Sequence, residues 1–337
     1  MQTAATVTRA LERVAATTAR RQRLRVEWHE GFGQGLHAAY TAVGGEEWVP
    51  AALLIRVLAT PGPHRKRVAV VYRDESPCAV VPLREAGRFW EPLLQGVIPE
   101  INAFPCVSHQ EEVLASLNLN IGCWASLEPP SGNRNLRWAE PKPCYELNVH
   151  QDPEPYWRSR NLWKTIVQAR NRTSAFELVV DDAEACSWGI EQWRDRFYTG
   201  ANDQVSSKWN DRISVANWAL ANGWRMHSWH LRDRERDRWV AGVTGFVHDG
   251  RLSFGTLFRD PEYDWHGVGH RCFHEVFLWA RSQGLKTVSL GADWEYKRRW
   301  APPLGTQWDF VVSPLPVHAW NAVVKLKDRA LSAGRRG

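Results

Sequence analysis

Hydrophobic and polar positions alternate in two stretches, and each stretch predicts strands joined by tight turns. Residues 67–83 (RVAVVYRDESPCAVVPL) have the pattern of a β-branched strand, a polar turn and a second strand. Residues 226–258 predict a strand, a charged turn, a second strand, an Asp249–Gly250 turn and a third strand. Both stretches enter their first turn through an Arg-Asp pair, Arg73–Asp74 and Arg232–Asp233. The shared order of strand, turn and strand indicates an internal duplication.

A stretch rich in Pro, Gly, Asn and Ser, residues 125–144, separates the two units and has no sustained period. It predicts a connector near the middle of the chain, which at 337 residues is long enough for two domains. We therefore expect an N-terminal domain over 1–140 and a C-terminal domain over 145–337.

The period changes after the second hairpin, where the strand 252–258 leads through a glycine loop into a helix over about 268–283. Gly284 is placed to end this helix, and the strand 286–293 follows. A strand, helix and strand in this order require the two strands to be parallel. One apolar face of the helix contains Val268, Cys272, Val276, Trp279 and Ala280, and the polar side contains His270, His274 and Arg281.

Three histidines, His266, His270 and His274, follow one another at intervals of four and raise the question of a metal site. Gly267 and Gly269 lie at the transition from loop to helix, so His266 precedes the regular helix and is not aligned with the other two. No H-E-x-x-H order and no cysteine at ligand spacing accompany them. We therefore expect no metal site and two solvated helix histidines.

The two glycines have a second interpretation. A strand followed by G-x-G at a helix N-terminus exposes backbone N–H groups and the positive end of the helix dipole, which suits a pyrophosphate. The residues that would form this cradle are His266, Gly267, Val268, Gly269 and His270.

Composition narrows the class of protein. Hydrophobic residues make up 44% of the chain and charged residues 24%, as in ordinary soluble globular proteins. The net charge of +6 permits an anionic partner such as a nucleotide, a coenzyme or RNA. The 6 cysteines form no C-x-x-C pair, which argues against a zinc ribbon or a disulfide scaffold and favours a cytoplasmic location. The apolar stretch 48–59 is too short to span a bilayer and contains Arg56, so no membrane segment is expected.

A predicted basic helix over 156–172 permits two interpretations. Its charged face is either simply solvated or an anion clamp for a carboxylate, a phosphate or an RNA backbone. The candidate substrate-binding residues are Arg158, Lys164 and Arg170, together with Arg298 further along the chain. The 20 tryptophans are spread along the whole chain, mostly at apolar periodic positions, which favours core packing over base stacking.

These features resemble the GCN5-related N-acetyltransferases (GNAT), whose Q/R-x-x-G-x-G/A loop after the fourth strand grips the coenzyme A pyrophosphate. The segment DWHGVG matches both glycines and has Asp264 at the basic or amide position. A closer resemblance is to the cellulose-biosynthesis acetyltransferase (CelD/BcsL-like) family, with its basic helix, hairpin, degenerate glycine loop and G-x-x-x-Y-K-x-x-W signature. That signature is GADWEYKRRW here, residues 291–300, and the resemblance covers about 150–303 and, faintly, 67–83. This group is similar in turn to the Fem-type peptidyltransferases, which pair two acetyltransferase-like folds and use aminoacyl-tRNA.

The resemblance implies an α/β (α+β) chain with two tandem GNAT-like domains, each a mixed, mostly antiparallel sheet with flanking helices. It implies a degenerate first domain and a second domain that carries the donor site. The function implied is acyl transfer from acyl-CoA, a co-substrate rather than a bound cofactor, to an amine or hydroxyl of a small molecule or sugar. Aminoacyl-tRNA is the alternative donor, favoured by Asp264, the basic helix and the Fem-type resemblance. A non-catalytic binding module is a third possibility.

The signature segment begins at the carboxyl end of a predicted parallel strand, where ligands gather in open α/β sheets. Acyl transfer to an amine needs a base, donors for the developing oxyanion and an acid for the leaving group. Asp293 or Glu295 is the candidate base, Tyr296 the candidate acid and Lys297 the candidate cationic stabiliser. The alternative is that Tyr296 packs in the sheet and that Lys297, Arg298 and Arg299 belong to a solvated basic turn.

Overall fold

The structure is a computed structural model. It describes residues 24–62, 64–86, 89–94, 97–98, 104–108, 110–126, 136–197, 203–292 and 295–312.

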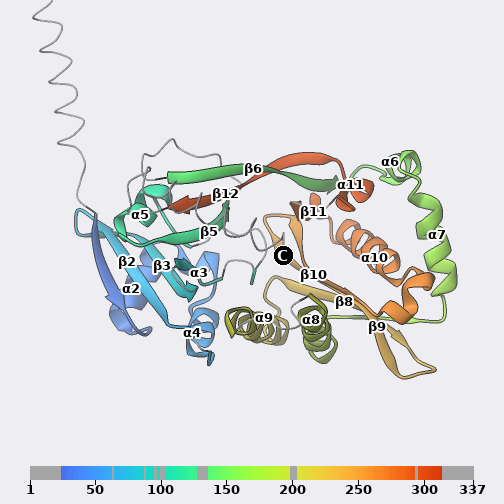
Figure 1. The fold of residues 1–337 in the computed structure, drawn as a ribbon, viewed down its shortest axis with the longest axis horizontal. Coiled ribbons are helices and arrows are strands. Elements are labelled where there is room, and N and C mark those ends of the chain that lie inside the picture. The colour runs from blue at the N-terminus through green and yellow to red at the C-terminus, as the bar shows by residue number, and fades with distance from the viewer. Residues whose placement is uncertain are drawn as a thin grey trace, which may run out of the picture.

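Twelve strands form one continuous sheet through the molecule (Figure 1). Their order is β1-β2-β3-β4-β5-β12-β6-β11-β10-β9-β8-β7. All neighbours are antiparallel except the pairs β4–β5 and β10–β11. The strands are β1 (Arg25–His29), β2 (Lys66–Arg73), β3 (Ser76–Ala86), β4 (Phe89–Pro92), β5 (Ile121–Ser126), β6 (Leu136–Asn148), β7 (Glu177–Val180), β8 (Met226–Asp233), β9 (Arg238–His248), β10 (Arg251–Arg259), β11 (Thr287–Ala292) and β12 (Pro303–Val312).

The two ends of the sheet repeat the same order of elements. β1–β5 and β7–β11 each consist of antiparallel neighbours that end in a parallel pair. A helix joins the parallel strands in each half, α5 (Gln110–Ser116) in the first and α10 (Val268–Ser282) in the second. Further helices lie between the first two strands of each half: α2 (Gln34–Ala42), α3 (Gly45–Trp48) and α4 (Ala51–Ala59) in the first, and α8 (Ala183–Phe197) and α9 (Asp203–Ala221) in the second.

The two halves exchange their last strands at the centre of the sheet. β6 follows the first half in the chain but pairs with β11 of the second half. β12 follows the second half but pairs with β5 of the first. β6 and β12 pair with each other in the middle, where they cross the top of the view in Figure 1. Each half of the sheet is therefore completed by a strand from the other half.

β6 corrects the prediction of a connector over 125–144, because a strand runs through its second part. Pro141 and Pro143 lie within that strand and pair with Trp308 and Thr306 of β12. Proline is compatible with extended backbone but lacks an N–H, so these residues look like loop residues in the sequence. The proposed domain boundary at 140–145 lies inside β6.

Local periodicity predicted the remaining strands of the two hairpins correctly. β2–β3 and β8–β9–β10 have the expected order, and Asp249 and Gly250 have φ values of 51° and 77°, as a tight two-residue hairpin turn requires. The strand–helix–strand unit β10–α10–β11 is confirmed, since β10 and β11 are parallel. The predicted basic helix is instead two helices, α6 (Glu154–Ser159) and α7 (Trp163–Arg172), broken at Asn161 with φ 54°. Asn tolerates this left-handed conformation better than most residues.

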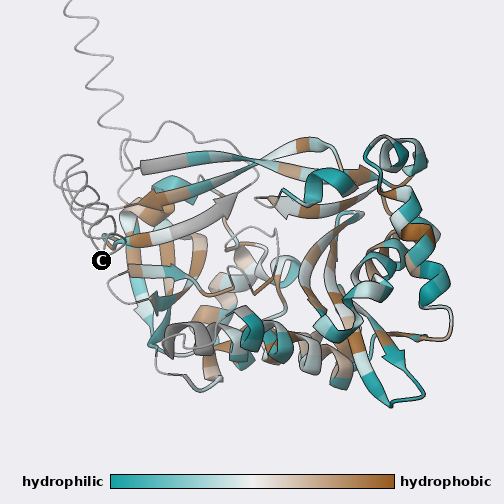
Figure 2. Ribbon diagram, turned by 45° about the vertical axis from the view of Figure 1, so that its right-hand side comes forward, coloured by the Kyte–Doolittle hydropathy of each residue, from teal (hydrophilic) through white to brown (hydrophobic). Residues whose placement is uncertain are grey.

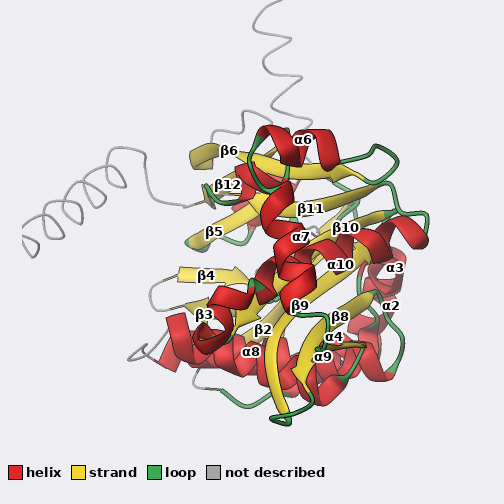
Figure 3. Cartoon of the chain, turned by 90° about the vertical axis from the view of Figure 1, so that its right-hand side faces the viewer, coloured by secondary structure: helices red, strands yellow, loops and turns green. Residues whose placement is uncertain are grey.

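Helices cover both faces of the second half of the sheet (Figure 3). α10 and α7 cover one face, where the buried residues of β8–β11 form a core with Trp157, Val268 and Val276. α8 and α9 cover the other face, where a second core joins both halves and includes Leu54 of α4 and Val215 of α9. Figure 2 shows the apolar residues along the strands and hydrophilic residues at the tip of the β8–β9 hairpin. None of the described helices is long and apolar enough to cross a bilayer.

Candidate functional site

The parallel strands β10 and β11 pair only at their beginnings. Their register joins Arg251–Ser253 to Thr287–Ser289, while β10 continues to Arg259 and β11 to Ala292. Over these later residues the described register contains no pairing between the two strands. Their backbone groups at the carboxyl ends are therefore not engaged with each other, and this is the end of a parallel pair where ligands gather.

A β-bulge lies on the other side of β10 at the same level. The register with β9 shifts between Phe254 and Leu257. Within the shift, the backbone N–H of Thr256 donates to Oγ1 of Thr244 at 2.8 Å instead of to a strand partner, and Gly255 is exposed. Bulges bend a strand and redirect its backbone groups. The bulge therefore gives β10 an exposed backbone segment beside the gap between the two strands.

The start of α10 lies directly beyond the end of β10. A short 3₁₀ helix, η1 (Pro261–His266), connects them, and Gly267 has a left-handed φ of 76°. The backbone N–H groups of Val268, Gly269 and His270 follow in the first turn of this 15-residue helix, where the helix dipole is positive. The five residues proposed for the pyrophosphate cradle therefore lie together at this helix start.

Two arginines that were not among the predicted binding residues, Arg259 and Arg299, flank the helix start. Burial, together with the positive charges of Arg299 and Arg259, lowers the pKa of His270 to about 4. Arg259 Nη1 also lies 2.8 Å from Oδ1 of Asp264, the carboxylate that departs from the family's loop pattern. The surroundings of the helix start are thus positive despite Asp264. The sequence signal was an arginine at the last position of a strand, which is too common to be informative alone.

The two glycines of the loop differ in their surroundings. A Cβ on Gly267 would lie 2.9 Å from Cβ of Ala169 on α7, so this glycine permits the close approach of two helices. A Cβ on Gly269 would meet only Cδ of Arg259, at an ordinary 3.5 Å. Gly267 therefore has a structural role that the sequence did not show, while Gly269 faces the charged side of the helix start.

The expectation of solvated helix histidines was wrong. His274 is 4% exposed and packs against Trp157 and Trp163, with ring centroids 6.0 and 6.3 Å away. Burial lowers the pKa of His274 to about 4. His270 stacks on Trp300 at 5.6 Å. The period of α10 could not reveal that α6 and α7 cover this side of the helix.

His266 lies in a separate aromatic group, with its ring 5.5 Å from that of Phe176 and 5.4 Å from that of Tyr263. Within the part of the chain that the structure describes, no group of three or more His, Cys, Asp or Glu side chains is placed to hold a metal ion.

The signature segment after β11 is only partly solvated. Asp293 lies outside the described residues. Glu295 is exposed, and Tyr296 is 45% exposed. Desolvation raises the pKa of Tyr296, whose ring lies edge-on to Phe273 at 6.5 Å. Lys297 begins the short helix α11 (Lys297–Trp300) and is buried. Its Nζ donates to the carbonyl oxygen of Ala292 at 2.8 Å, so Lys297 is not part of a solvated turn and contacts the end of β11.

The proposed substrate-binding cations do not form one cluster. Arg158 on α6 forms an ion pair with Glu154. Lys164 and Arg170 are exposed on α7. Arg298 on α11 donates through Nε to Oη of Tyr145 on β6 at 2.8 Å.

A second group of polar residues, also missed, lies where β10 and β11 begin to separate. Ser253, Ser289 and Glu146 occupy one row across β10, β11 and β6. Arg251 Nη2 lies 2.7 Å from Oε1 of Glu146 and donates to Oγ of Ser289 at 3.0 Å. Cys144 completes the group, with its Sγ 3.7 Å from the same Arg251 nitrogen. We call Cys144, Glu146, Arg251, Ser253 and Ser289 the β6 cluster.

The β6 cluster faces away from α10. The neighbouring residues Leu147, Leu252 and Val288 point into the core beneath α10, and side chains alternate between the two faces of a sheet. The cluster therefore lies on the face that α8 and α9 cover further along the sheet. A charged residue between two apolar ones, as Glu146 is between Tyr145 and Leu147, was the available sequence signal.

Comparison with known proteins identifies the type of domain. Residues 158–298 match the model of a family described as an acetyltransferase (GNAT) domain. No curated protein matches the sequence. Among solved structures, the C-terminal domain (DUF2156) of a "Putative Lysylphosphatidylglycerol Synthetase" from Agrobacterium fabrum has a TM-score of 0.51 at 10% identity, over 88% of this chain and 96% of that one.

Two further solved structures are similar. L-PGS from Bacillus licheniformis has a TM-score of 0.49 at 11% identity, over 90% of this chain and 98% of that one. A tandem GNAT protein from the clavulanic acid biosynthesis pathway has a TM-score of 0.45 at 10% identity, over 86% and 98%. The expected fold class, a mixed α/β chain with a large, mostly antiparallel sheet and flanking helices, is confirmed. Residues 158–298 thus match the acetyltransferase (GNAT) domain by sequence, and the chain as a whole is similar in fold to the C-terminal domain from Agrobacterium fabrum.

Proposed function

We propose that the protein is an acyltransferase that moves an acyl group from acyl-CoA to an amine or hydroxyl of a small-molecule or sugar acceptor. The observation that carries this proposal is the start of α10, which lies beyond the separating strands β10 and β11 and is flanked by Arg259 and Arg299.

The geometry supports binding of the donor in an extended form. The N–H groups of Val268, Gly269 and His270 would donate to the pyrophosphate, and Arg259 and Arg299 would balance its charge. The acyl arm would then extend between β10 and β11, whose later backbone groups are not paired with each other. The bulge around Gly255 would offer a backbone donor to the thioester oxygen as negative charge develops on it.

The signature residues keep the roles that we proposed from the sequence. Tyr296 is a candidate acid for the leaving thiolate, because a tyrosine phenol carries its proton at neutral pH. Lys297 contacts the carbonyl of Ala292 and could stabilise charge only near the end of β11. Asp293 and Glu295 are candidate bases. Membership of the CelD/BcsL-like family remains part of this proposal and rests on the order of the features over about 150–303, including the signature at 291–300.

Aminoacyl-tRNA is the second candidate donor. The exposed Lys164 and Arg170 on α7 support contact with an RNA backbone. Asp264 favoured this alternative because its negative charge would repel the pyrophosphate of coenzyme A. The ion pair with Arg259 offsets that charge and so removes this reason. Acyl-CoA is therefore the donor that the site supports best.

Isothermal titration of the full chain with acetyl-CoA tests the proposal. We expect saturable binding that Arg259→Gln and Arg299→Gln each weaken by about tenfold or more. A matched control is Arg281→Gln, an exposed arginine at the other end of α10. If acetyl-CoA does not bind and charged tRNA binds and is deacylated only in the presence of an acceptor, the second donor replaces the first. If neither binds, the protein is not an acyltransferase of either kind.

A further inference from the structure

Trp265 exposes a large aromatic surface beside the helix start at which we propose that the donor binds. Of the aromatic side chains that the structure describes, only Trp28, Trp265 and Tyr296 are exposed, and Trp265 is the most exposed at 65%. It lies on η1, three residues before Val268, which provides the first N–H group of the pyrophosphate cradle. A 3₁₀ helix rises about 2.0 Å per residue, so the Trp265 backbone is within roughly 6 Å of that residue along the chain axis.

The indole of Trp265 is held in a defined position. Arg172, the last residue of α7, donates through Nη1 to the carbonyl oxygen of Trp265 at 2.7 Å. The ring of His266 packs against the indole, with ring centroids 3.7 Å apart and an interplanar angle of 39°. Most of Trp265 nevertheless remains open to solvent, so the indole offers an anchored platform for a second flat ring.

Arg172 also places positive charge beside the indole. Its side chain is exposed, and its Cζ lies 5.8 Å from the centre of the Trp265 ring. No carboxylate among the described residues forms an ion pair with Arg172. Burial and the positive charges of Arg172 and Arg236 lower the pKa of His266, although Asp233 opposes them. The surroundings of the platform are therefore cationic on the side of α7.

Resting on the proposed function, we infer that Trp265 and Arg172 bind the nucleotide end of the donor, with the adenine stacked on the indole and the ribose 3′-phosphate paired with the guanidinium. Every base has a π-face that stacks on an aromatic side chain, and the planar arginine fork matches the oxygens of a phosphate. In coenzyme A a single ribose separates the adenine from the pyrophosphate. An adenine on Trp265 therefore suits a pyrophosphate at the N–H groups of Val268 and Gly269.

The inference narrows the class of donor. Acyl groups on the phosphopantetheine arm of a carrier protein have neither the adenine nor the 3′-phosphate, so they would contact neither Trp265 nor Arg172. The terminal adenosine of a charged tRNA has the adenine but no phosphate on its 3′-oxygen, so it would use Trp265 alone. A CoA thioester is the donor that would use both residues.

Isothermal titration of the full chain with acetyl-CoA tests the subsite, together with competition by acetyl-3′-dephospho-CoA and S-acetyl-4′-phosphopantetheine. The unaltered protein should bind acetyl-CoA at least about tenfold more tightly than either competitor. Trp265→Ala should weaken acetyl-CoA binding by about tenfold and leave the affinity for acetyl-phosphopantetheine within about twofold. Trp265→Phe keeps a flat ring and should retain most of the affinity.

Arg172→Gln tests the phosphate contact separately. It should abolish the preference for acetyl-CoA over the 3′-dephospho form. Arg281→Gln is the matched control, because this exposed arginine lies at the far end of α10 and should change neither affinity. A 3′-phosphate preference that persists in Arg172→Gln overturns this contact.

The outcomes separate the subsite from the proposed function. If the unaltered protein does not bind acetyl-CoA, the proposed function itself fails. If acetyl-CoA binds but Trp265→Ala binds it equally well, or loses affinity for acetyl-phosphopantetheine by the same factor, the indole does not hold the adenine. Circular dichroism establishes that each variant is folded. If Trp265→Ala is not, Trp265→Leu takes its place with the same expectation, since it keeps an apolar side chain and removes the flat ring.

Discussion

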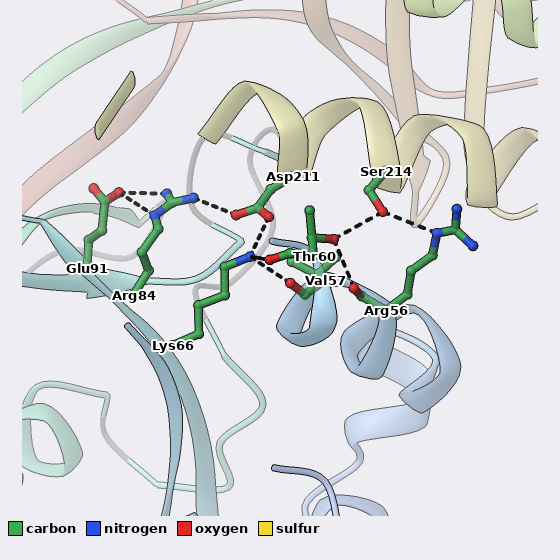
Figure 4. Close-up of polar contacts among 8 residues, drawn as sticks. All are labelled: Arg56, Val57, Thr60, Lys66, Arg84, Glu91, Asp211 and Ser214. Carbon is green, nitrogen blue, oxygen red and sulfur yellow. Dashed lines mark hydrogen bonds and ion pairs between the residues drawn. The ribbon is translucent and has the colours of Figure 1, made fainter. Parts of the chain in front are cut away.

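Arg84 of β3 donates through Nη1 to Oδ2 of Asp211 on α9 at 2.8 Å, and this ion pair joins the two halves of the protein (Figure 4). Asp211 is 0% exposed and Arg84 1%. Lys66 of β2 donates to the other Asp211 oxygen at 2.7 Å, and Arg84 also contacts Glu91 of β4. Two cations of the first half thus converge on one carboxylate of the second, so α9 is fixed on the first half by charge as well as by packing.

Replacing Asp211 by Asn should strongly destabilise the protein, because Lys66 and Arg84 would remain buried without their shared counter-charge. We expect the free energy of unfolding to fall by about 3–5 kcal/mol. Chemical denaturation followed by far-UV circular dichroism measures this change. Glu30→Gln is the control, since it breaks an exposed pair with Arg65 and should cost less than about 1 kcal/mol. Equal effects of both variants would show that the buried network does not hold the halves together.

Stability should fall between about pH 6.5 and pH 4. Burial lowers the pKa of His230, His270 and His274 to about 4, from 6.5 in the unfolded chain. Because the folded state resists protonation, the full stability is present above pH 6.5, and protonation of the unfolded chain removes it as the pH falls. The loss amounts to up to about 3 kcal/mol for His230 alone. Urea unfolding at pH 7.5, 6 and 5 measures it.

His274→Phe provides the control for that pH dependence, since it keeps an aromatic ring beside Trp157 and Trp163 and removes one titrating group. The variant should lose less stability over the same pH interval. A stability that does not change from pH 7.5 to pH 5 would mean that these histidines are protonated in the folded state.

The two loop glycines should respond differently to alanine. At Gly267 an alanine would have to adopt a left-handed φ of 76°, and its Cβ would lie 2.9 Å from Cβ of Ala169. Gly267→Ala should therefore lower the free energy of unfolding by about 1 kcal/mol or more, and the melting temperature with it. Gly269→Ala meets no such obstacle and should fold normally, but its methyl group would project beside Arg259 and weaken acetyl-CoA binding by about tenfold. Thermal shift and titration calorimetry on both variants distinguish the effects. Unchanged affinity in a folded Gly269→Ala protein would remove the pyrophosphate cradle from the proposal.

The Arg259–Asp264 pair permits a test of charge at the helix start. Arg259→Gln should weaken acetyl-CoA binding by more than the loss of one contact would. The substitution also leaves the negative charge of Asp264 without its counter-charge near the phosphates. Adding Asp264→Asn should restore part of the affinity. A double variant that binds no better than Arg259→Gln would show that Asp264 does not act on the donor.

Local patterns predicted the hairpins and the strand–helix–strand unit because each depends on neighbours in the chain. The turn at Asp249 and Gly250 and the apolar face of α10 are examples. The burial of His274 depends on α6 and α7, which the period of α10 does not encode. The pairing of Glu146 with Arg251 depends on the order of β6, β11 and β10 in the sheet. Two tandem domains would each keep their own strands, whereas here β6 of the first half pairs with β11 of the second.

The strand exchange has a consequence for synthesis on the ribosome. β5 is made early, but its partner β12 is among the last described residues to emerge. Until residues 303–312 are synthesised, β5 presents an open edge that can pair with another nascent chain. Contacts between segments so far apart in the chain also form slowly. The first half therefore waits for translation of the second before its sheet is complete.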